Sequence, residues 1–210
     1  MIFNLGGPDK PEAIKPFLFN LFNDPAILMI PNPFRWLLAK IISTLRAPES
    51  KKIYEKVGGK STLLAETLAQ ASAIKINLSK YFNNFEVFIF MRYWKPSVSE
   101  VIEKIKLYDP EHIILMPLYP QFSCTTSGTS IKAFKQEASR IGLQVPQDVL
   151  CCYPTNQEFI NASVKNIIKG LDAAQTFGKP RLLLSAHGLP EKTINSGDPY
   201  QWQVEKTSAE

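Results

Sequence analysis

Apolar residues recur at helical spacing over several stretches of the chain, most clearly over residues 33–46. Large apolar side chains fall there at intervals of three and four residues, which places them on one stripe of a helix. They are Phe34, Leu37, Leu38, Ile41, Ile42 and Leu45. The same spacing predicts helices over residues 14–21, 63–78, 131–141 and 159–171. Ser97 and Glu100 form a capping-box pattern that opens a further helix ending at Leu107.

Short apolar runs between these segments predict strands. Residues 85–91 and 113–118 are rich in apolar and aromatic side chains, which is typical of strands buried in a parallel sheet. Further strands are expected at residues 2–5, 145–152 and 181–186. Strands and helices therefore alternate along the chain. This alternation predicts an α/β fold with a parallel sheet and helices on both of its faces.

The domain organisation is indicated by the helix that begins soon after Pro154, which would cross to a second sheet. Residues 1–154 would form a first domain. Residues 155–210 would begin a second domain that the chain does not finish. We expect the strand at residues 181–186 and a helix start at residues 200–210 to belong to this second domain.

The composition is that of a globular protein, with 45% hydrophobic and 20% charged residues. No apolar run approaches the roughly 20 residues of a membrane-spanning helix. The first residues carry no basic start and no small-residue cleavage site, so we expect no signal peptide and a cytoplasmic location. Cys124, Cys151 and Cys152 lack CxxC spacing and indicate reduced thiols, not a disulfide framework or a zinc site.

Positive charge is concentrated in residues 33–60, a segment that accounts for the whole formal net charge of +5. Its basic residues are Arg35, Lys40, Arg46, Lys51, Lys52, Lys56 and Lys60, and its acidic residues are Glu49 and Glu55. Such a segment is a solvated face, or it binds an anionic membrane surface or an anionic small ligand. Nucleic acid is not expected as a partner, because the basic residues do not alternate with aromatic residues that could stack on bases.

Candidate binding residues follow the expected strands. In an open parallel sheet, ligands bind beyond the carboxyl ends of the strands. The strands of this chain end in residues 4–7, 92–94, 119–123 and 187–188, and these loops contain aromatic, cationic or titratable side chains. A flat aromatic ligand with anionic edges would suit them, since aromatic side chains contact the face and arginine binds the charges.

His187 is the strongest single candidate for a functional residue in these loops. It follows an expected apolar strand, and a neutral imidazole there would accept a proton or bind a first-row metal. Alternatively, it only terminates the strand. The other histidine, His112, is expected at the surface.

Two other functions are not supported by the motifs. Residues 58–61 do not form a nucleotide-binding P-loop, because Tyr54 stands where that motif requires glycine. A hydrolase has little support, because Ser185 is not in a GxSxG nucleophile motif.

Six motifs occur in the order in which the ferrochelatase family has them. They are residues 4–8 (NLGGP), 54–61 (YEKVGGKS), 91–96 (MRYWKP), 118–124 (LYPQFSC), 185–190 (SAHGLP) and 197–200 (GDPY). The chain therefore resembles a ferrochelatase over essentially its whole length, and its Arg-Tyr-Trp sequence is more similar to protoporphyrin-type than to coproporphyrin-type enzymes. The resemblance implies two Rossmann-like domains with parallel sheets, the second incomplete here, and a porphyrin in the cleft between them.

The resemblance also implies an activity and site residues. The activity is a lyase reaction of haem biosynthesis, insertion of ferrous iron into protoporphyrin IX. His187 would bind the iron and accept pyrrole protons. Residues matching the family's porphyrin-binding positions are Arg46, Tyr54, Ser61, Arg92 and Tyr93. Iron is then a substrate, and no resident cofactor is expected.

The sequence departs from the family at two features. The family's catalytic glutamate lies in a segment resembling Asp-His-x-Glu, which the 210 residues do not contain. We therefore expect the chain to be inactive alone, and a catalytically incomplete tetrapyrrole-binding fragment is the alternative function. We also expect it to be poorly soluble, because the unfinished second domain would leave the strand at residues 181–186 short of partners. Some relatives hold a [2Fe–2S] cluster through a cysteine near Cys124 and three later cysteines. The later three are missing, so no cluster is expected.

The basic, apolar helix at residues 33–46 predicts peripheral binding to the inner face of a membrane.

Overall fold

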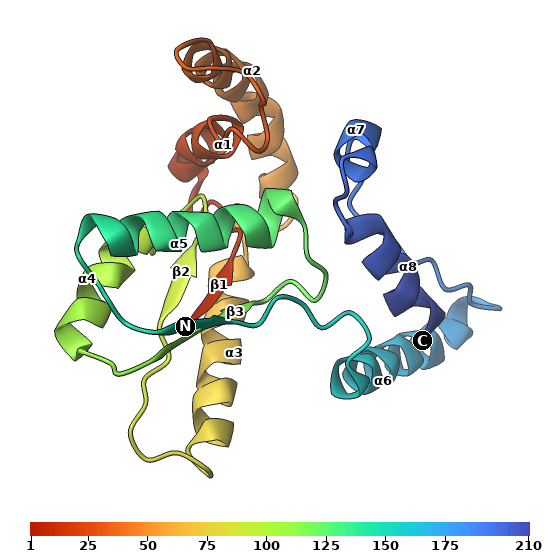
Figure 1. Ribbon diagram of the computed structural model, residues 1–210. Coiled ribbons are helices and arrows are strands. Elements are labelled where there is room, and N and C mark those ends of the chain that lie inside the picture. The colour runs from red at the N-terminus through yellow and green to blue at the C-terminus, as the bar shows by residue number, and fades with distance from the viewer. The chain divides into compact units, whose positions relative to one another are not determined.

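Four short parallel strands form the centre of the first of two units in the computed structural model, which describes residues 1–210 (Figure 1). The strands are β1 (Ile2–Asn4), β2 (Ile89–Met91), β3 (Ile113–Pro117) and β4 (Gln147–Val149). Their order in the sheet is β2-β1-β3-β4, and all pairs are parallel. The predicted parallel sheet of an α/β fold is therefore confirmed, and the direction of connection reverses between β1 and β3.

The first unit comprises Met1–Leu118 and Cys124–Leu150, and the second comprises Tyr119–Ser123 and Cys151–Glu210. A domain boundary at Pro154 stays a prediction.

All four strands are shorter than predicted, β1 and β3 by one residue each and β2 and β4 by several. β2 was expected over residues 85–91 but begins at Ile89. Its partner β1 begins at Ile2, which lies opposite Ile89, so the preceding residues have no neighbouring strand to pair with. β4 covers only Gln147–Val149 of the expected residues 145–152, and it pairs with β3 over those three positions.

The helices of the first unit cover both faces of the sheet, as the alternation of elements predicted. They are α1 (Ile14–Phe22), α2 (Phe34–Glu55), α3 (Leu63–Leu78), α4 (Val98–Tyr108) and α5 (Thr129–Arg140), with a 3₁₀ turn at Pro11–Ala13 and a π turn at Cys124–Gly128. Phe3 stacks on Phe90, which in turn stacks on Phe134 of α5. The next residue along β1, Asn4, points to the opposite face, where its amide donates to Thr67 of α3.

The core of the first unit lies between the sheet and the α4–α5 pair. Phe3, Phe90 and Phe134 are fully buried there, together with Ile102 of α4. The predicted capping box is confirmed at the start of α4: Ser97 accepts a hydrogen bond from the Glu100 backbone, and the Glu100 carboxylate accepts one from the Ser97 backbone. This cap starts α4 directly after the turn that follows β2.

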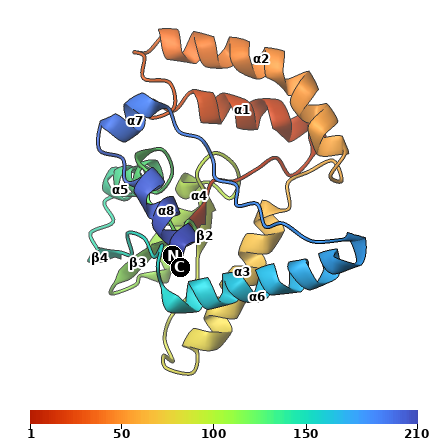
Figure 2. The same cartoon turned by 90° about the vertical axis from the view of Figure 1, so that its right-hand side faces the viewer.

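Helices α1 and α2 form a hairpin that lies side by side in both views (Figures 1 and 2). α2 packs through two small residues, Ala39 and Ser43, which are fully buried and let α1 approach closely. The helix is longer than the predicted residues 33–46, because it continues through Pro48 to Glu55. Most of its apolar stripe is exposed.

The second unit consists of helices and a docked loop. Its helices are α6 (Gln157–Ala174), α7 (Glu191–Asn195) and α8 (Tyr200–Ala209), and a 3₁₀ turn follows α6 at Gln175–Phe177. The loop at residues 119–123 binds α8 and the turn before it: Phe122 donates its backbone N–H to Gln203 Oε1 (2.7 Å), and Ser123 donates its hydroxyl to Asp198 Oδ2 (3.0 Å). Two of the six sequence motifs therefore meet in this unit.

The strand predicted at residues 181–186 is wrong. That segment has no regular secondary structure, and its three leucines, Leu182, Leu183 and Leu184, are exposed. A strand is stabilised by hydrogen bonds to a neighbouring strand, and no strand of the second unit is available to provide them. Apolar content alone therefore does not make this segment a strand.

Candidate functional site

Three of the sequence motifs meet at the carboxyl edge of the sheet in the first unit. Beyond β1 and β2, the backbone N–H groups of Arg92 and Tyr93 donate to the carbonyls of Asn4 and Leu5, each at 2.9 Å. The N–H of Ser61 donates to the Pro8 carbonyl at 2.8 Å. The loop after β1 thus holds the turn after β2 on one side and the turn between α2 and α3 on the other. This is the edge where parallel sheets bind ligands.

Glycine permits the close approach of these three segments. Gly6 has a φ of +87°, and a Cβ there would lie 2.9 Å from the Met91 Cβ and 3.0 Å from the Trp94 Cβ. A Cβ on Gly7 would lie 2.4 Å from the Ser61 Oγ. Side chains at either position would push the motifs apart, so the two glycines of the NLGGP motif determine how the edge is assembled.

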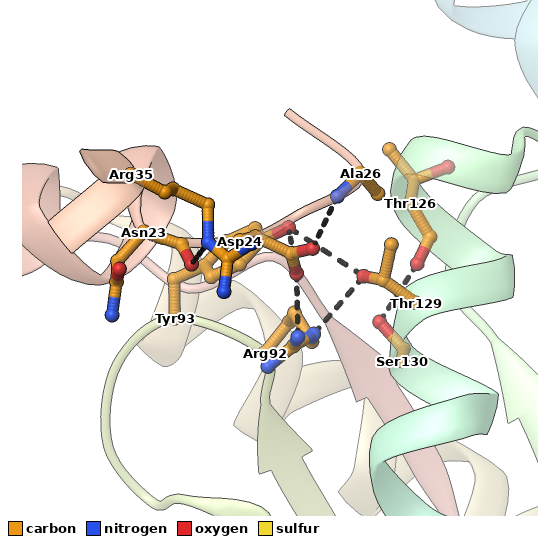
Figure 3. A network of polar contacts seen from close by, with 9 residues as sticks. All are labelled: Asn23, Asp24, Ala26, Arg35, Arg92, Tyr93, Thr126, Thr129 and Ser130. Carbon is orange, nitrogen blue, oxygen red and sulfur yellow. Dashed lines mark hydrogen bonds and ion pairs between the residues drawn. The ribbon is translucent and has the colours of Figure 1, made fainter. Parts of the chain in front are cut away.

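A network of polar side chains lies beside this edge, with the carboxylate of Asp24 at its centre (Figure 3). Asp24 is buried, and its Oδ2 accepts hydrogen bonds from Arg92 Nη2 and from the Tyr93 hydroxyl at 3.0 Å. Its Oδ1 accepts from the backbone N–H of Ala26 at 2.8 Å. Arg92 Nε donates to Thr129 Oγ1 at 3.0 Å, which connects the network to α5.

Tyr93 is held entirely inside the protein. Its side chain is buried, and burial raises the pKa of its hydroxyl far above the ordinary value, as does the nearby Asp24 charge, so the hydroxyl stays protonated and donates to Asp24. The Arg92 guanidinium carbon lies 4.9 Å from the centre of the Tyr93 ring, a cation–π distance. Asn20 donates its side-chain amide to the Tyr93 carbonyl at 3.0 Å.

Arg92 is the member of the network that reaches solvent. Its side chain is 23% exposed, whereas that of Asp24 is 3% exposed. Nε and Nη2 are bound to protein, and Nη1 makes no hydrogen bond in the structure. The guanidinium is therefore fixed by the protein and still has N–H donors that make no protein hydrogen bond.

The other predicted porphyrin-binding residues lie along α2 and the turn after it. Arg46 is exposed, and its guanidinium carbon lies 5.9 Å from the centre of the Phe22 ring. Tyr54 lies near the end of α2, half-buried, and burial raises the pKa of its hydroxyl. Ser61 accepts a hydrogen bond from the N–H of Leu63, the first residue of α3, at 3.2 Å. No hydrogen bond joins Arg46 or Tyr54 to the Arg92 network, and the roles of all these residues stay predictions.

His187 lies in the second unit, exposed and in an irregular segment before α7. Its expected place at the end of a strand is wrong, because residues 181–186 form no strand. Its role as iron ligand and proton acceptor stays a prediction. The other histidine, His112, is exposed as predicted, and its ring nitrogen lies 2.9 Å from the Asp148 carboxylate.

The structure contains no group of three or more His, Cys, Asp or Glu residues that could hold a metal ion. Cys124 and Cys151 are exposed, Cys152 is half-buried, and none of the three forms a disulfide. The sequence-based expectation that the chain holds no [2Fe–2S] cluster and no resident cofactor stays a prediction.

Asp24 is the site residue that sequence reasoning missed. It follows α1 in the sequence Asn-Asp-Pro, which is typical of a turn, and its acceptance of the Ala26 N–H is the bond such turns make. Nothing in that local pattern marks the side chain as buried. Its partner Arg92 lies 68 residues further along the chain, so only the fold brings the pair together.

Comparison with known proteins agrees with the motif order. The ferrochelatase family model matches residues 1–210, the full chain. A ferrochelatase of Pelagibacter ubique is 51% identical over 209 residues, which cover 99% of this chain and 60% of that protein. Ferrochelatases of Wolbachia pipientis wMel and Rickettsia bellii are 49% and 50% identical, again over 99% of this chain but over 66% and 57% of their own lengths. The chain thus spans about three fifths of these relatives, and it belongs to the ferrochelatase family.

Proposed function

We propose that this chain serves the insertion of ferrous iron into protoporphyrin IX, the reaction that gives protohaem, and that its first unit binds the porphyrin. The observation that carries the proposal is the ferrochelatase family match over residues 1–210, with a named ferrochelatase 51% identical over 99% of the chain. The Arg-Tyr-Trp sequence at residues 92–94 favours protoporphyrin over coproporphyrin as the substrate.

The geometry of the carboxyl edge supports porphyrin binding. A porphyrin is a flat apolar ring with two anionic propionates, so it requires an apolar surface and fixed cations. Arg92 offers a guanidinium that is anchored on two nitrogens and free on the third. Ser61 and the Gly6-Gly7 turn lie at the same edge, where the two glycines allow the neighbouring segments to approach closely.

His187 is proposed as the residue that accepts pyrrole protons and binds the incoming iron. Insertion removes two N–H protons from the macrocycle, and a neutral imidazole both accepts protons and binds first-row metals. The exposure of His187 leaves its ring accessible to a ligand. Iron is the substrate in this scheme and leaves in the product.

The alternative function is a catalytically incomplete tetrapyrrole-binding fragment. It is favoured by one observation, the lack of an Asp-His-x-Glu segment among the 210 residues. A chain without the family's glutamate would bind porphyrin through Arg92 and its neighbours and would not complete metal insertion.

Titration of the purified chain with protoporphyrin IX tests the binding function. We expect saturable quenching of tryptophan fluorescence and a shift of the porphyrin absorbance. Arg92→Gln is expected to weaken binding about tenfold, because it removes the anchored cation. Arg140→Gln is the control, since Arg140 is an exposed arginine of α5 outside the network. The proposal is contradicted if binding does not saturate, or if both variants bind as the wild type does.

We also propose that α2 binds an anionic membrane surface. No helix of the structure has the length and apolar character needed to cross a membrane. The apolar stripe of α2 is nevertheless exposed to solvent, with Phe34 69%, Leu37 53%, Ile41 47% and Leu45 74% exposed. The basic residues around it, among them Lys40 and Arg46, would contact lipid phosphates while the stripe enters the headgroup region.

Flotation with liposomes measures this membrane binding. Leu37→Glu and Ile41→Glu are expected to abolish flotation with vesicles that contain anionic lipid and to leave the circular dichroism spectrum unchanged, because both side chains are exposed. Leu107→Glu is the matched control: Leu107 is an 87% exposed leucine of α4 and should float as the wild type does. Unfolding of the two α2 variants would show that the stripe packs in a core, and the proposal would then be wrong.

A further inference from the structure

Arg92 has a long side chain that would lose considerable conformational entropy on binding a ligand. In the structure this freedom is already restricted, because Asp24, Thr129 and the ring of Tyr93 hold the guanidinium from three sides (Figure 3). The two N–H groups of Nη1 and the second N–H of Nη2 make no hydrogen bond to protein. We propose that Asp24 is a positioning residue of the porphyrin site, a buried carboxylate that fixes Arg92 and Tyr93 so that Arg92 meets the ligand in one orientation. The inference rests on the proposed function.

The position requires a carboxylate and not merely a polar side chain. Asp24 is almost completely buried, and a buried carboxylate is costly unless its oxygens are all paired. Oδ1 accepts the Ala26 N–H, while Oδ2 accepts Arg92 Nη2 and the Tyr93 hydroxyl. The last two groups are both donors, so they can share one position only if an acceptor lies between them.

Asp24→Asn tests this requirement with almost no change in shape. The amide oxygen of asparagine can still accept from Ala26, so the turn after α1 keeps its hydrogen bond. Its NH₂ group would then face two donors, Arg92 and Tyr93. The guanidinium would lose one of its two protein anchors and would retain only the Thr129 hydrogen bond and the Tyr93 ring.

A double-mutant cycle of protoporphyrin binding separates positioning from stability. The cycle compares the wild type, Asp24→Asn, Arg92→Gln and the double variant in the same fluorescence titration. Asp24→Asn is expected to raise the dissociation constant about tenfold in the wild type and less than about twofold in the Arg92→Gln background. A residue that acts through Arg92 loses its effect once Arg92 is removed, whereas a residue needed only for folding does not.

Two further variants serve as the control and the safeguard. Thr67→Val removes another fully buried hydrogen bond in the first unit, to Asn4, and should lower the melting temperature without changing porphyrin affinity well below it. Should Asp24→Asn fail to fold, Thr129→Val removes the other anchor of Arg92 and leaves Asp24 in place. It is expected to weaken porphyrin binding several-fold, again only when Arg92 is present.

The outcomes distinguish the two proposals. Equal effects of Asp24→Asn with and without Arg92, or a loss of stability with unchanged affinity, would overturn the positioning role while porphyrin binding by the wild type stands. If the wild type does not bind porphyrin, the proposed function fails, and the positioning role falls with it because no site is left to position. Arginine ¹⁵Nη spectra should show an Arg92 Nη2–H resonance that is protected from exchange in the wild type and unprotected in Asp24→Asn, because Nη2 donates to Asp24.

Discussion

Replacing His187 with alanine is expected to lower iron insertion by roughly 10²–10⁴-fold, the usual cost of removing an acid–base group from a catalytic site. The assay uses a hybrid that joins this chain to the part of the Pelagibacter ubique relative that lies outside the match, because the 210 residues lack the Asp-His-x-Glu segment. The physical reason is that His187 is exposed and can reach a ligand, whereas the other histidine of the 210 residues, His112, is paired with Asp148.

His112→Ala is the control for this experiment and should leave iron insertion unchanged. Circular dichroism of the His187→Ala hybrid should match that of the unsubstituted hybrid, since the side chain is exposed and supports no packing. Retention of near-complete activity by His187→Ala would remove His187 from the mechanism and would require another group to accept the pyrrole protons.

Phe90→Ala is expected to destabilise the first unit by about 3–5 kcal/mol, the range for truncating a buried aromatic residue. Phe90 is fully buried in β2, with its ring 5.2 Å from Phe3 and 6.4 Å from Phe134 between ring centres. Its loss would leave a cavity between the sheet and α5. Since Arg92 follows β2 by one residue, the same variant should also weaken porphyrin binding.

Urea unfolding followed by circular dichroism measures this destabilisation. The matched control is Phe82→Ala, because Phe82 is 57% exposed and its ring makes only one aromatic contact, with Phe85. We expect its unfolding free energy to change by less than about 0.5 kcal/mol. Similar losses for the two variants would mean that β2 does not form the centre of the core.

Helical periodicity and strand-end rules predicted most of the first unit, because both depend on local sequence. The spacing over residues 63–78 predicted α3 within its observed bounds, and the Ser97 capping box predicted the start of α4. The placement of Arg92 at the carboxyl edge followed from the apolar run before it and from the parallel order of the strands. These inferences needed no knowledge of distant contacts.

Features that depend on distant partners could not be predicted in the same way. Residues 181–186 have the apolar content of a strand, but strand formation requires a neighbour, and none pairs with them. The spacing of the apolar residues on α2 is the same whether the stripe packs in a core or is exposed to solvent. Only the burial of Ala39 and Ser43 in the structure shows which face of the helix packs against the protein. The role of Asp24 could not be predicted for the same reason, since it depends on the hydrogen bond with the distant Arg92.

The central claim is that the chain supplies the porphyrin-binding part of a ferrochelatase, and a stopped assay of ferrous iron insertion into protoporphyrin IX tests it most directly. The assay compares the purified 210-residue chain with the hybrid that adds the unmatched part of the Pelagibacter ubique relative. We predict protohaem formation by the hybrid, a loss of that activity in its Arg92→Gln variant, and binding without turnover by the chain alone. A hybrid that folds but makes no protohaem, while the Pelagibacter ubique protein does so under the same conditions, would contradict the claim.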